Sequence, residues 1–407
     1  MHNSALPSQP LGAPASAPSR QPLRVLNDFA ALREEHRRIL SRERQEIAQG
    51  RLAIWNGLMW DNSLMYACDA VPLSIIELWR DGVPESHAVA EGHFQIPEEF
   101  CSSGKSILGR LHLLRDVTSR RVIVFAAGCD PRSITYELLK TDGFDIFTID
   151  NVTAFRSEPE RYEAYVAYLA KEFEGFAPWL IGTPIDQDRL REEIRFKNKV
   201  LALIQRILHL RQRNPLLISY IELQSIIMGG THFYGQRDQY LQLLEKTLLE
   251  LEELVVRTHP VRHVPIIVSG IASLAVIRAI EESGGAVVGS VRFGSEQYRE
   301  DVPPLESIAR YLLDIQLKGE GHDISGAPAS HRRFLTEELI QQTGARGVVS
   351  SGLVSCPFFS MASQLDQDYF SKRGVPFVAL ETPGNIMEGT PEEAQITRVK
   401  AFLEMLS

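Results

Sequence analysis

The chain alternates between short apolar runs rich in β-branched residues and longer runs in which apolar residues recur every three or four positions. Residues 121–128 (RVIVFAAG) and 144–150 (FDIFTID) have the length and β-branching that predict buried strands, and residues 131–140 between them predict a crossover helix. Further strands are predicted at residues 51–60, 264–270, 286–291, 345–351 and 375–380. Because strands alternate with helices, we expect an α/β fold with parallel sheets.

The middle of the chain follows a different pattern. From Asp186 to Arg257 the apolar residues keep a helical spacing almost throughout, and an amphipathic stretch from Asn27 to Ala48 predicts one more helix, with Asn27 as its N-cap. We therefore expect two Rossmann-like or flavodoxin-like parallel-sheet domains joined by a helical segment. The predicted boundaries are a disordered tail at 1–23, an N-terminal helix with the first α/β domain at 24–185, the helical segment at 186–260 and the second α/β domain at 261–407.

Composition and charge narrow the class of protein. Hydrophobic residues make up 44% and charged residues 23% of the 407 positions, which is ordinary globular composition. The net charge of −9 argues against a nucleic-acid surface, which would need a basic face. No apolar run approaches the roughly 18 residues of a membrane span, and the Ala-, Pro- and Ser-rich start lacks the apolar stretch of a signal peptide. We expect a cytoplasmic protein that binds neither nucleic acid nor membranes.

Three of the four cysteines fall where a site can form. Cys129 follows the strand at 121–128, and Cys356 comes shortly after the strand at 345–351. Each is followed at once, or after one residue, by proline and a predicted helix, so each lies at a helix N-terminus, where thiolates and anionic clusters are favoured. Cys101 lies in a probable helix opened by Pro97. Three thiolates suit an iron–sulfur cluster or zinc and leave one metal position open, whereas the absence of a C-x-x-C spacing keeps buried structural cysteine as the alternative.

Ligands of open α/β sheets bind beyond the carboxyl ends of strands, and a cleft between two domains is a usual place for a site. The predicted substrate cleft therefore takes in residues at the ends of the first and fourth predicted strands: Trp60, Asp61, Ser269 and Gly270.

Several familiar motifs are absent or incomplete. Gly104-Lys105-Ser106 resembles the end of a P-loop, but Glu99 stands where the first glycine belongs, so a polar helix face is the better interpretation. No G-x-G-x-x-G follows a strand and no G-x-S-x-G is present, which argues against a tight dinucleotide site and against a serine hydrolase. His232 is interpreted as a solvated or hydrogen-bonded loop histidine.

Five segments in order resemble the 2-hydroxyacyl-CoA dehydratase and benzoyl-CoA reductase family, of the D-component type. They are WNGLMWDNSLMYACDAVPL, the contexts of Cys101 (QIPEEFC) and Cys129 (GCD), the stretch VSGIASLAVIRAIEESGGAVVGSVRFGSEQYREDVP, the segment SCPFFSMASQLDQDYFSKRGVPFVALE and the closing AQITRVKAFLEML. The resemblance covers residues 51–407 and is specific to the family rather than to a substrate.

The resemblance implies a [4Fe–4S] cluster on Cys101, Cys129 and Cys356, oxygen sensitivity, and dehydration of a 2-hydroxyacyl-CoA through a ketyl radical. It also implies a paralogous second subunit and an ATP-dependent activator, since this chain has no Walker motif of its own. The alternatives are an aromatic acyl-CoA reductase or another low-potential reductase, a partner subunit that only relays electrons, and a zinc protein without a redox role.

The chain departs from the family pattern next to the predicted cleft. Asp61 stands where proline is usual, Asp69 where glycine is usual, and Cys68 where alanine is common. The substrate can therefore differ from the familiar acyl-CoA esters. Cys68 could fill a fourth corner of a cluster, but a packing role is the better interpretation, because free cysteine behaves as a small hydrophobic residue.

Overall fold

The described part of the chain leaves several stretches aside. The computed structural model describes residues 27–35, 38, 52–58, 61–75, 78, 83–125, 129–150, 152, 154–257, 263–270, 272–290, 296–317, 329–353, 356–382 and 393–407. The predicted tail at 1–23 and Trp60 lie outside these residues, as does most of the second half of the helix predicted from Asn27 to Ala48. Residues 27–35 and 38 are helical, as that prediction expects.

The first sheet has four parallel strands in the order β2-β1-β3-β4. They are β1 (Ala53–Asn56), β2 (Val71–Ser74), β3 (Arg121–Phe125) and β4 (Asp145–Ile149). Successive side chains point to opposite faces: Trp55 packs into one hydrophobic core and its neighbour Ile54 into another, and both are fully buried. Helices cover both faces of this sheet, which is why its strands are apolar on both sides.

The second sheet repeats the same arrangement. Its parallel strands β5 (Val264–Gly270), β6 (Gly285–Ser290), β7 (Gly347–Leu353) and β8 (Phe377–Thr382) are ordered β6-β5-β7-β8. In each sheet the second strand lies outside the first and the third and fourth follow on the other side, as in the first four strands of flavodoxin-like sheets. The predicted fold class, two parallel-sheet α/β units of the Rossmann or flavodoxin-like kind, is confirmed.

Helices make up most of the rest of the described chain. They are α2 (Ser63–Ala67), α3 (Val83–Phe94), α4 (Ser102–Leu114), α5 (Asp130–Thr141), α6 (Tyr162–Glu174), α7 (Phe176–Ile181), α8 (Gln187–Arg213), α9 (Tyr220–Gly229), α10 (Arg237–Arg257), α11 (Leu274–Glu282), α12 (Pro304–Leu317), α14 (Ala329–Thr343), α15 (Pro357–Ser371) and α16 (Glu393–Leu406), with short 3₁₀ turns at Pro159–Arg161 and Phe233–Gly235.

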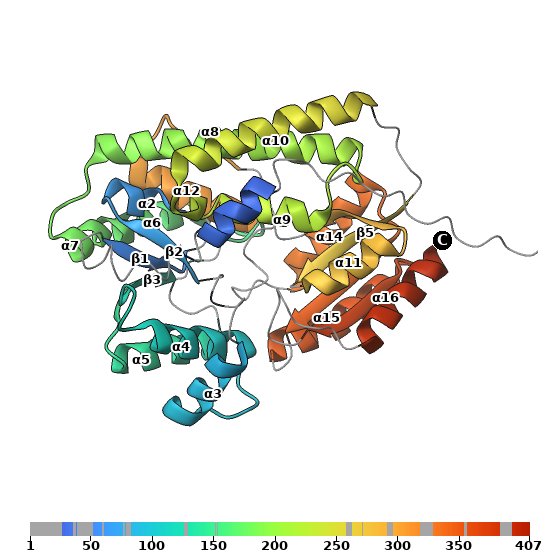
Figure 1. Ribbon diagram of the computed structural model, residues 1–407, viewed down its shortest axis with the longest axis horizontal. Coiled ribbons are helices and arrows are strands. Elements are labelled where there is room, and N and C mark those ends of the chain that lie inside the picture. The colour runs from blue at the N-terminus through green and yellow to red at the C-terminus, as the bar shows by residue number, and fades with distance from the viewer. Residues whose placement is uncertain are drawn as a thin grey trace, which may run out of the picture.

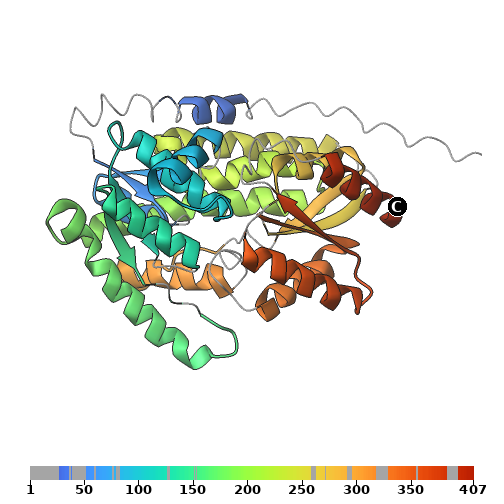
Figure 2. The same cartoon turned by 90° about the horizontal axis from the view of Figure 1, so that it is seen from below.

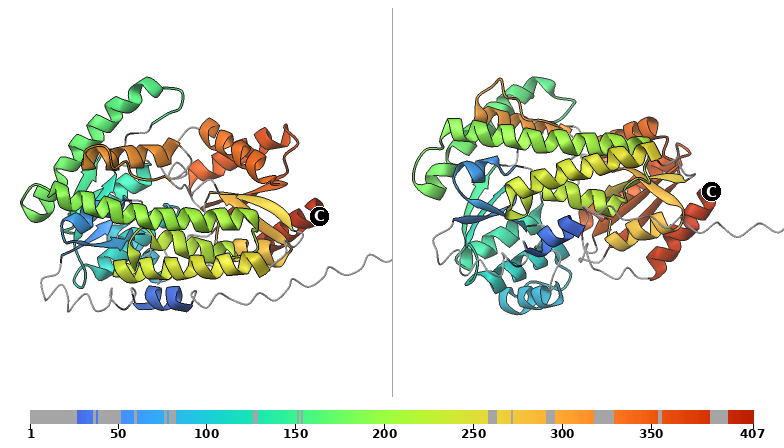
Figure 3. Two further views of the ribbon diagram at one scale, coloured as in Figure 1. Left: turned by 90° about the horizontal axis from the view of Figure 1, so that it is seen from above. Right: turned by 45° about the horizontal axis from the view of Figure 1, so that its top comes forward.

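Two long helices connect the sheets. Figure 1 shows the first sheet at the left and the second at the right, with α8 and α10 running side by side along the top of both, and Figures 2 and 3 show the same arrangement from other sides. Near its start α8 buries Leu190 and Ile194 in the core of the first sheet, and further along it buries Ile204 and Ile207 in the core of the second. One amphipathic helix of 27 residues thus supplies apolar side chains to both cores.

The sequence pattern missed one strand. The strand predicted at 264–270 has the bounds of β5, but no strand was predicted at Val71–Ser74. Pro72 lies in that strand, and proline cannot donate a hydrogen bond to a neighbouring strand. Because β2 is at the edge of its sheet, no strand lies on its outer side to accept a hydrogen bond there, and the missing N–H of Pro72 is tolerated. The domain boundaries proposed from the sequence stay predictions.

Helices α3 and α4 approach each other closely at a glycine. A Cβ atom on Gly109 of α4 would lie 1.8 Å from the carbonyl oxygen of Ser86 in α3, well inside any van der Waals contact. Gly92, also in α3, has nothing within 4 Å of where its Cβ would be. The crossing of the two helices therefore depends on the missing side chain at 109 and not on that at 92.

We expect Gly109→Ala to lower the free energy of unfolding by at least about 1–3 kcal/mol, because the backbones must move apart to admit the methyl group. The matched control, Gly92→Ala, should leave it unchanged or raise it by up to about 1 kcal/mol, since alanine favours the helix. Urea unfolding of both variants measures the difference. Equal stability of the two would contradict the close approach.

Candidate functional site: three cysteines at the carboxyl edges of two sheets

In each sheet the order of the strands reverses at one place, the topological switch point. It lies between β1 and β3 in the first sheet and between β5 and β7 in the second. Ligands of such sheets bind beyond the carboxyl ends of the strands at this point. Asp61 follows β1 and Cys129 follows β3, while Gly270 ends β5 and Cys356 follows β7. Asp61, Cys129, Gly270 and Cys356 thus follow or end the strands that border the two switch points.

All three cysteines occupy the same position in a helix. Cys101 is the N-cap of α4, Cys129 of α5 and Cys356 of α15, and proline stands in the first turn of the last two helices. The free N–H groups of a helix's first turn carry partial positive charge, so each helix favours an anionic sulfur or an anionic cluster at its start. The helices after Cys129 and Cys356 were predicted to begin here because proline fits the first turn. The prediction that Pro97 opens the helix containing Cys101 is wrong, since α4 begins at Ser102.

The three thiols influence one another electrostatically. Burial raises the pKa of the Cys101 thiol, and the Cys356 and Cys129 thiols raise it further. The backbone N–H groups of Gly104 and Ser103, in the first turn of α4, act in the opposite direction and lower it. Such effects weaken with distance, so Cys129 and Cys356 lie in the electrostatic neighbourhood of the Cys101 thiol.

An arginine lies beside two of these thiols. Burial lowers the pKa of the Arg132 guanidinium, but Tyr136 and the thiols of Cys129 and Cys101 outweigh it and raise that pKa above its ordinary value. The Arg132 Nε donates a hydrogen bond to the Tyr136 hydroxyl at 3.2 Å, which holds the guanidinium in place. A fixed positive charge next to the thiols favours their ionised form.

The positions of the sulfurs can be compared with the geometry that a single zinc ion requires. One zinc ion about 2.3 Å from each sulfur would hold three thiolates about 3.8 Å apart. The described residues contain one group of three ligating side chains whose ligand atoms all lie within 4.8 Å of one another, and it does not include the cysteines. The three sulfurs are therefore not all within 4.8 Å of one another in this structure.

The fourth cysteine lies apart from the other three. Cys68 ends α2 and is buried in the first sheet's core, 4% exposed. Burial raises the pKa of its thiol to about 11, and the charged groups that act on it are Arg189 and Asp69 rather than the other cysteines. This placement agrees with a packing role.

The predicted cleft residues differ in how accessible they are. Asp61 is completely buried: the Tyr298 hydroxyl donates a hydrogen bond to its Oδ1 at 2.7 Å, and burial raises its pKa. Ser269 is 4% exposed, and Gly270 has a φ of +77° where a Cβ would lie 2.3 Å from the carbonyl oxygen of Ser351, so only glycine fits. A role of these residues toward a substrate stays a prediction.

The family model for the D-component of 2-hydroxyglutaryl-CoA dehydratase matches residues 59–406. The chain belongs to this family. It is also 26% identical, over 294 residues, to the Escherichia coli (strain K12) protein named "Putative dehydratase subunit YjiM", an alignment that covers 70% of this chain and 74% of that protein. The resemblance seen in the five sequence segments is thereby confirmed, and the family identifies a dehydratase subunit. No helix in the described residues of this D-component relative has both the length and the apolarity to cross a membrane.

Lys105 and His232, two residues considered in the sequence as possible functional groups, are buried and make hydrogen bonds within the fold. Lys105, in the segment that resembles a P-loop, is buried rather than on a polar face, and its Nζ donates to Glu91 Oε1 at 2.8 Å and to the Glu98 carbonyl oxygen at 2.6 Å. His232 is hydrogen-bonded, as predicted, and 1% exposed; its Nδ1 accepts a hydrogen bond from the backbone N–H of Tyr234 at 2.9 Å.

A buried lysine near Asp61 escaped the sequence interpretation. Lys197 of α8 is 2% exposed, and its Nζ donates to the carbonyl oxygen of Gly230. Burial lowers its pKa to about 8, against the opposing effect of the Asp61 carboxylate. A signal was present, because Lys197 falls on the same helical stripe as Leu190, Ile194, Leu201 and Ile204, which are all buried. In this D-component relative, α8 thus places the buried amine of Lys197 near Asp61, in the loop that follows β1.

We predict that Lys197 makes stability depend on pH above pH 8. The folded state releases its proton near pH 8 and the unfolded chain near the ordinary value of 10.5, so the unfolded state binds more protons between these values and stability rises with pH there. Relative to Lys197→Met, the wild type should gain about 3 kcal/mol from pH 8 to pH 10.5. Urea unfolding across this range measures the gain.

Lys199→Met is the matched control, since it removes an exposed lysine two residues away on the same helix. This variant should retain the pH dependence of the wild type. A constant difference between the wild type and Lys197→Met over the whole range would contradict the lowered pKa.

Proposed function

We propose that this chain is the cluster-bearing subunit of a dehydratase that removes water from a 2-hydroxyacyl-CoA thioester. What supports the proposal is that Cys101, Cys129 and Cys356 are each the N-cap of a helix, and that Cys129 and Cys356 both act on the pKa of the Cys101 thiol. Cys101, Cys129 and Cys356 would hold a [4Fe–4S] cluster. When bound, such a cluster supplies a low-potential electron and an iron that acts as a Lewis acid, which are the requirements for dehydration through a ketyl radical.

The protein's own groups would support an anionic cluster in three ways. The N-terminal turns of α4, α5 and α15 direct N–H groups toward the sulfurs. The Arg132 guanidinium adds a full positive charge beside Cys129 and Cys101. Cys101 and Cys356 are half-buried, which strengthens these interactions, whereas Cys129 is exposed and leaves one side of the site open to a ligand.

The position of Cys68 favours an enzyme over an electron relay. Cys68 is buried in the core of the first sheet, and its electrostatic partners are Arg189 and Asp69. With three cysteine ligands, one iron keeps a position that a substrate oxygen can take. A cluster with four cysteine ligands would have no such position, and the relay alternative needs none.

The partners of the proposed enzyme follow from the family. A component designated D implies at least one further subunit in the complex, and we infer a paralogous second subunit. The described residues and the rest of the sequence contain no Walker motif. We therefore infer that a separate ATP-hydrolysing activator supplies the low-potential electron.

The first prediction concerns the cluster ligands. Anaerobically purified wild-type protein should contain about four iron and four sulfide ions per chain, and serine at position 101, 129 or 356 should deplete both, because each thiolate holds one corner. Iron and sulfide analysis with visible absorption measures this. Cys68→Ala is the matched control and should keep full iron content. One equivalent of zinc without iron in the wild type would contradict the proposal.

The second prediction separates dehydration from reduction. With a second subunit, an activator, ATP and a strong reductant, a 2-hydroxyacyl-CoA should give the enoyl-CoA and water. Loss of water requires no net electrons, so product should exceed the reductant consumed by at least about tenfold, whereas a reductase consumes reductant in proportion to product. Product and reductant measured together decide between them. Turnover by the isolated chain in air, without reductant, would contradict the radical mechanism.

A further inference from the structure

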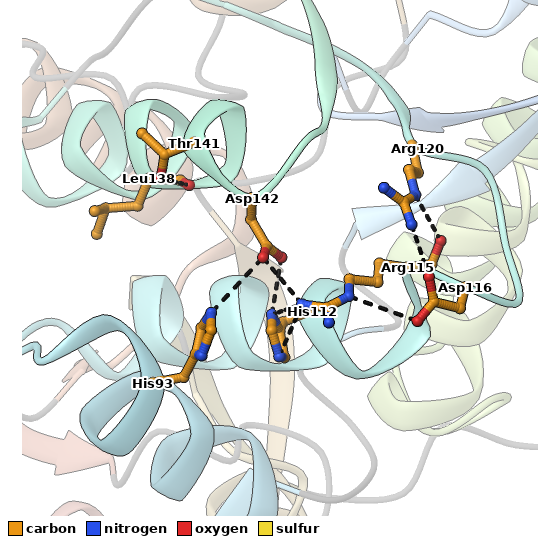
Figure 4. A network of polar contacts seen from close by, with 8 residues as sticks. All are labelled: His93, His112, Arg115, Asp116, Arg120, Leu138, Thr141 and Asp142. Atoms are coloured by element: carbon orange, nitrogen blue, oxygen red, sulfur yellow. Dashed lines mark hydrogen bonds and ion pairs between the residues drawn. The ribbon is translucent and has the colours of Figure 1, made fainter.

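A second group of ligating side chains lies at the opposite ends of α4 and α5. Figure 4 shows His93, His112 and Asp142 pointing toward one another from three different helices. His93 is in the last turn of α3, His112 is in the last turn of α4, and Asp142 is the C-cap of α5. Their ligand atoms all lie within 4.8 Å of one another. Neither the cysteines nor the predicted cleft residues belong to this group.

The distances between these side chains suit a small cation. His112 Nδ1 lies 2.8 Å from Asp142 Oδ2, and His93 Nε2 lies 3.7 Å from Asp142 Oδ1. Nitrogen and oxygen ligands about 2.1 Å from a tetrahedral zinc ion lie about 3.4 Å apart, a separation between these two values. Two imidazoles and one carboxylate form a common ligand set for zinc, with a fourth position left for water.

Packing holds the two imidazoles in place. The Phe94 ring stands edge-on to His93, with centroids 4.6 Å apart, and to His112, with centroids 5.4 Å apart. The backbone N–H of Asp142 bonds the last carbonyls of α5, and its carboxylate bonds His112 and Arg115, which hold it beside the imidazoles. The ligands are therefore already oriented before any ion binds, which lowers the entropy cost of binding.

The charge around this group also favours a cation. Three helices end here, and the unpaired carbonyls of a helix's last turn carry partial negative charge. A positive group in fact occupies the space: Arg115 Nη1 lies 2.7 Å from His112 Nδ1 and 3.0 Å from Asp142 Oδ1. Arg115 is one-third exposed, and its Nε lies 3.6 Å from the exposed carboxylate of Asp116, so the guanidinium has another partner when it leaves.

We propose that His93, His112 and Asp142 form a binding site for Zn²⁺, and that Arg115 is the cation that the metal displaces. The bound ion ties the C-terminal ends of α3, α4 and α5 to one another. Since α4 has 13 residues at about 1.5 Å each, the site lies about 20 Å from the cysteine at the start of that helix. The ion is therefore structural and does not act on a substrate at the cysteines.

The test uses Co²⁺ as a coloured substitute for Zn²⁺ in the anaerobically purified full-length protein. Cobalt at this site should give the visible bands of an ion ligated by nitrogen and oxygen. Cobalt bound to cysteine would instead give thiolate-to-cobalt charge-transfer bands, so their absence excludes the cysteine site. Competition with Zn²⁺ gives the zinc affinity. We expect His93→Ala and His112→Ala to weaken binding at least about tenfold, and Arg115→Ala to tighten it, because no guanidinium then competes.

His93 is half exposed, so its replacement leaves the fold intact, and circular dichroism verifies this for each variant. His209→Ala removes an exposed histidine from α8 and is the matched control, expected to bind as the wild type does. Cobalt bands that lack thiolate character and vanish in His93→Ala support the site. Absence of such bands in both the wild type and Arg115→Ala, or equal binding by His93→Ala and His209→Ala, would overturn it.

Discussion

The structure depends on the way a parallel sheet must be connected. After each strand, the chain returns to the starting edge of the sheet through a helix, so the helices that follow the strands begin at the carboxyl edge. Helix N-termini with unpaired N–H groups therefore collect at that edge. Cys129 and Cys356 begin the helices after β3 and β7, which are equivalent strands of two sheets with the same order. The topology itself thus brings anion-stabilising groups to the place where two of the thiols lie.

Polar contacts between distant segments fasten the loop after β1. Asp61 accepts a hydrogen bond from Tyr298, 237 positions away, Asn62 Nδ2 donates to the Thr231 carbonyl oxygen, and the Tyr66 hydroxyl donates to that of His232. These bonds are buried or partly buried, where an unpaired polar group is costly. The loop that borders the first switch point is therefore fixed by segments distant in the sequence as well as by Asn56 of β1, whose Nδ2 donates to the Asp61 carbonyl oxygen at 2.8 Å.

The sequence predicted those features that follow from local pattern. The strand at 264–270 and the starts of α5 and α15 could be predicted because β-branching and a proline in the first turn act within a few residues. β2 could not, because Pro72 lies within a strand of only four residues, and the edge position that accommodates it is a property of the whole sheet.

The site residues divide in the same way. Cys129 and Cys356 could be proposed from strand ends and helix starts, and Cys101 was added with the support of the family resemblance. The pairing of Asp61 with Tyr298 bridges 237 positions, and the sequence around neither residue indicates it. His112 and Asp142 are 30 positions apart and meet only because α4 and α5 lie side by side. Contacts of this kind depend on how distant segments pack against one another. The pattern of apolar residues within one segment does not specify that packing.

The two ends of helices α4 and α5 lie beside groups of opposite charge. Their N-termini carry Cys101 and Cys129, whose thiolates complement the positive end of a helix dipole, and their C-termini carry His112 and Asp142 around a cation. The α3–α4 crossing at Gly109 lies between these ends and allows no side chain, so α4 has little freedom to shift along α3. The same pair of packed helices therefore carries two of the thiols at one end and the imidazole and carboxylate groups at the other, about 20 Å away.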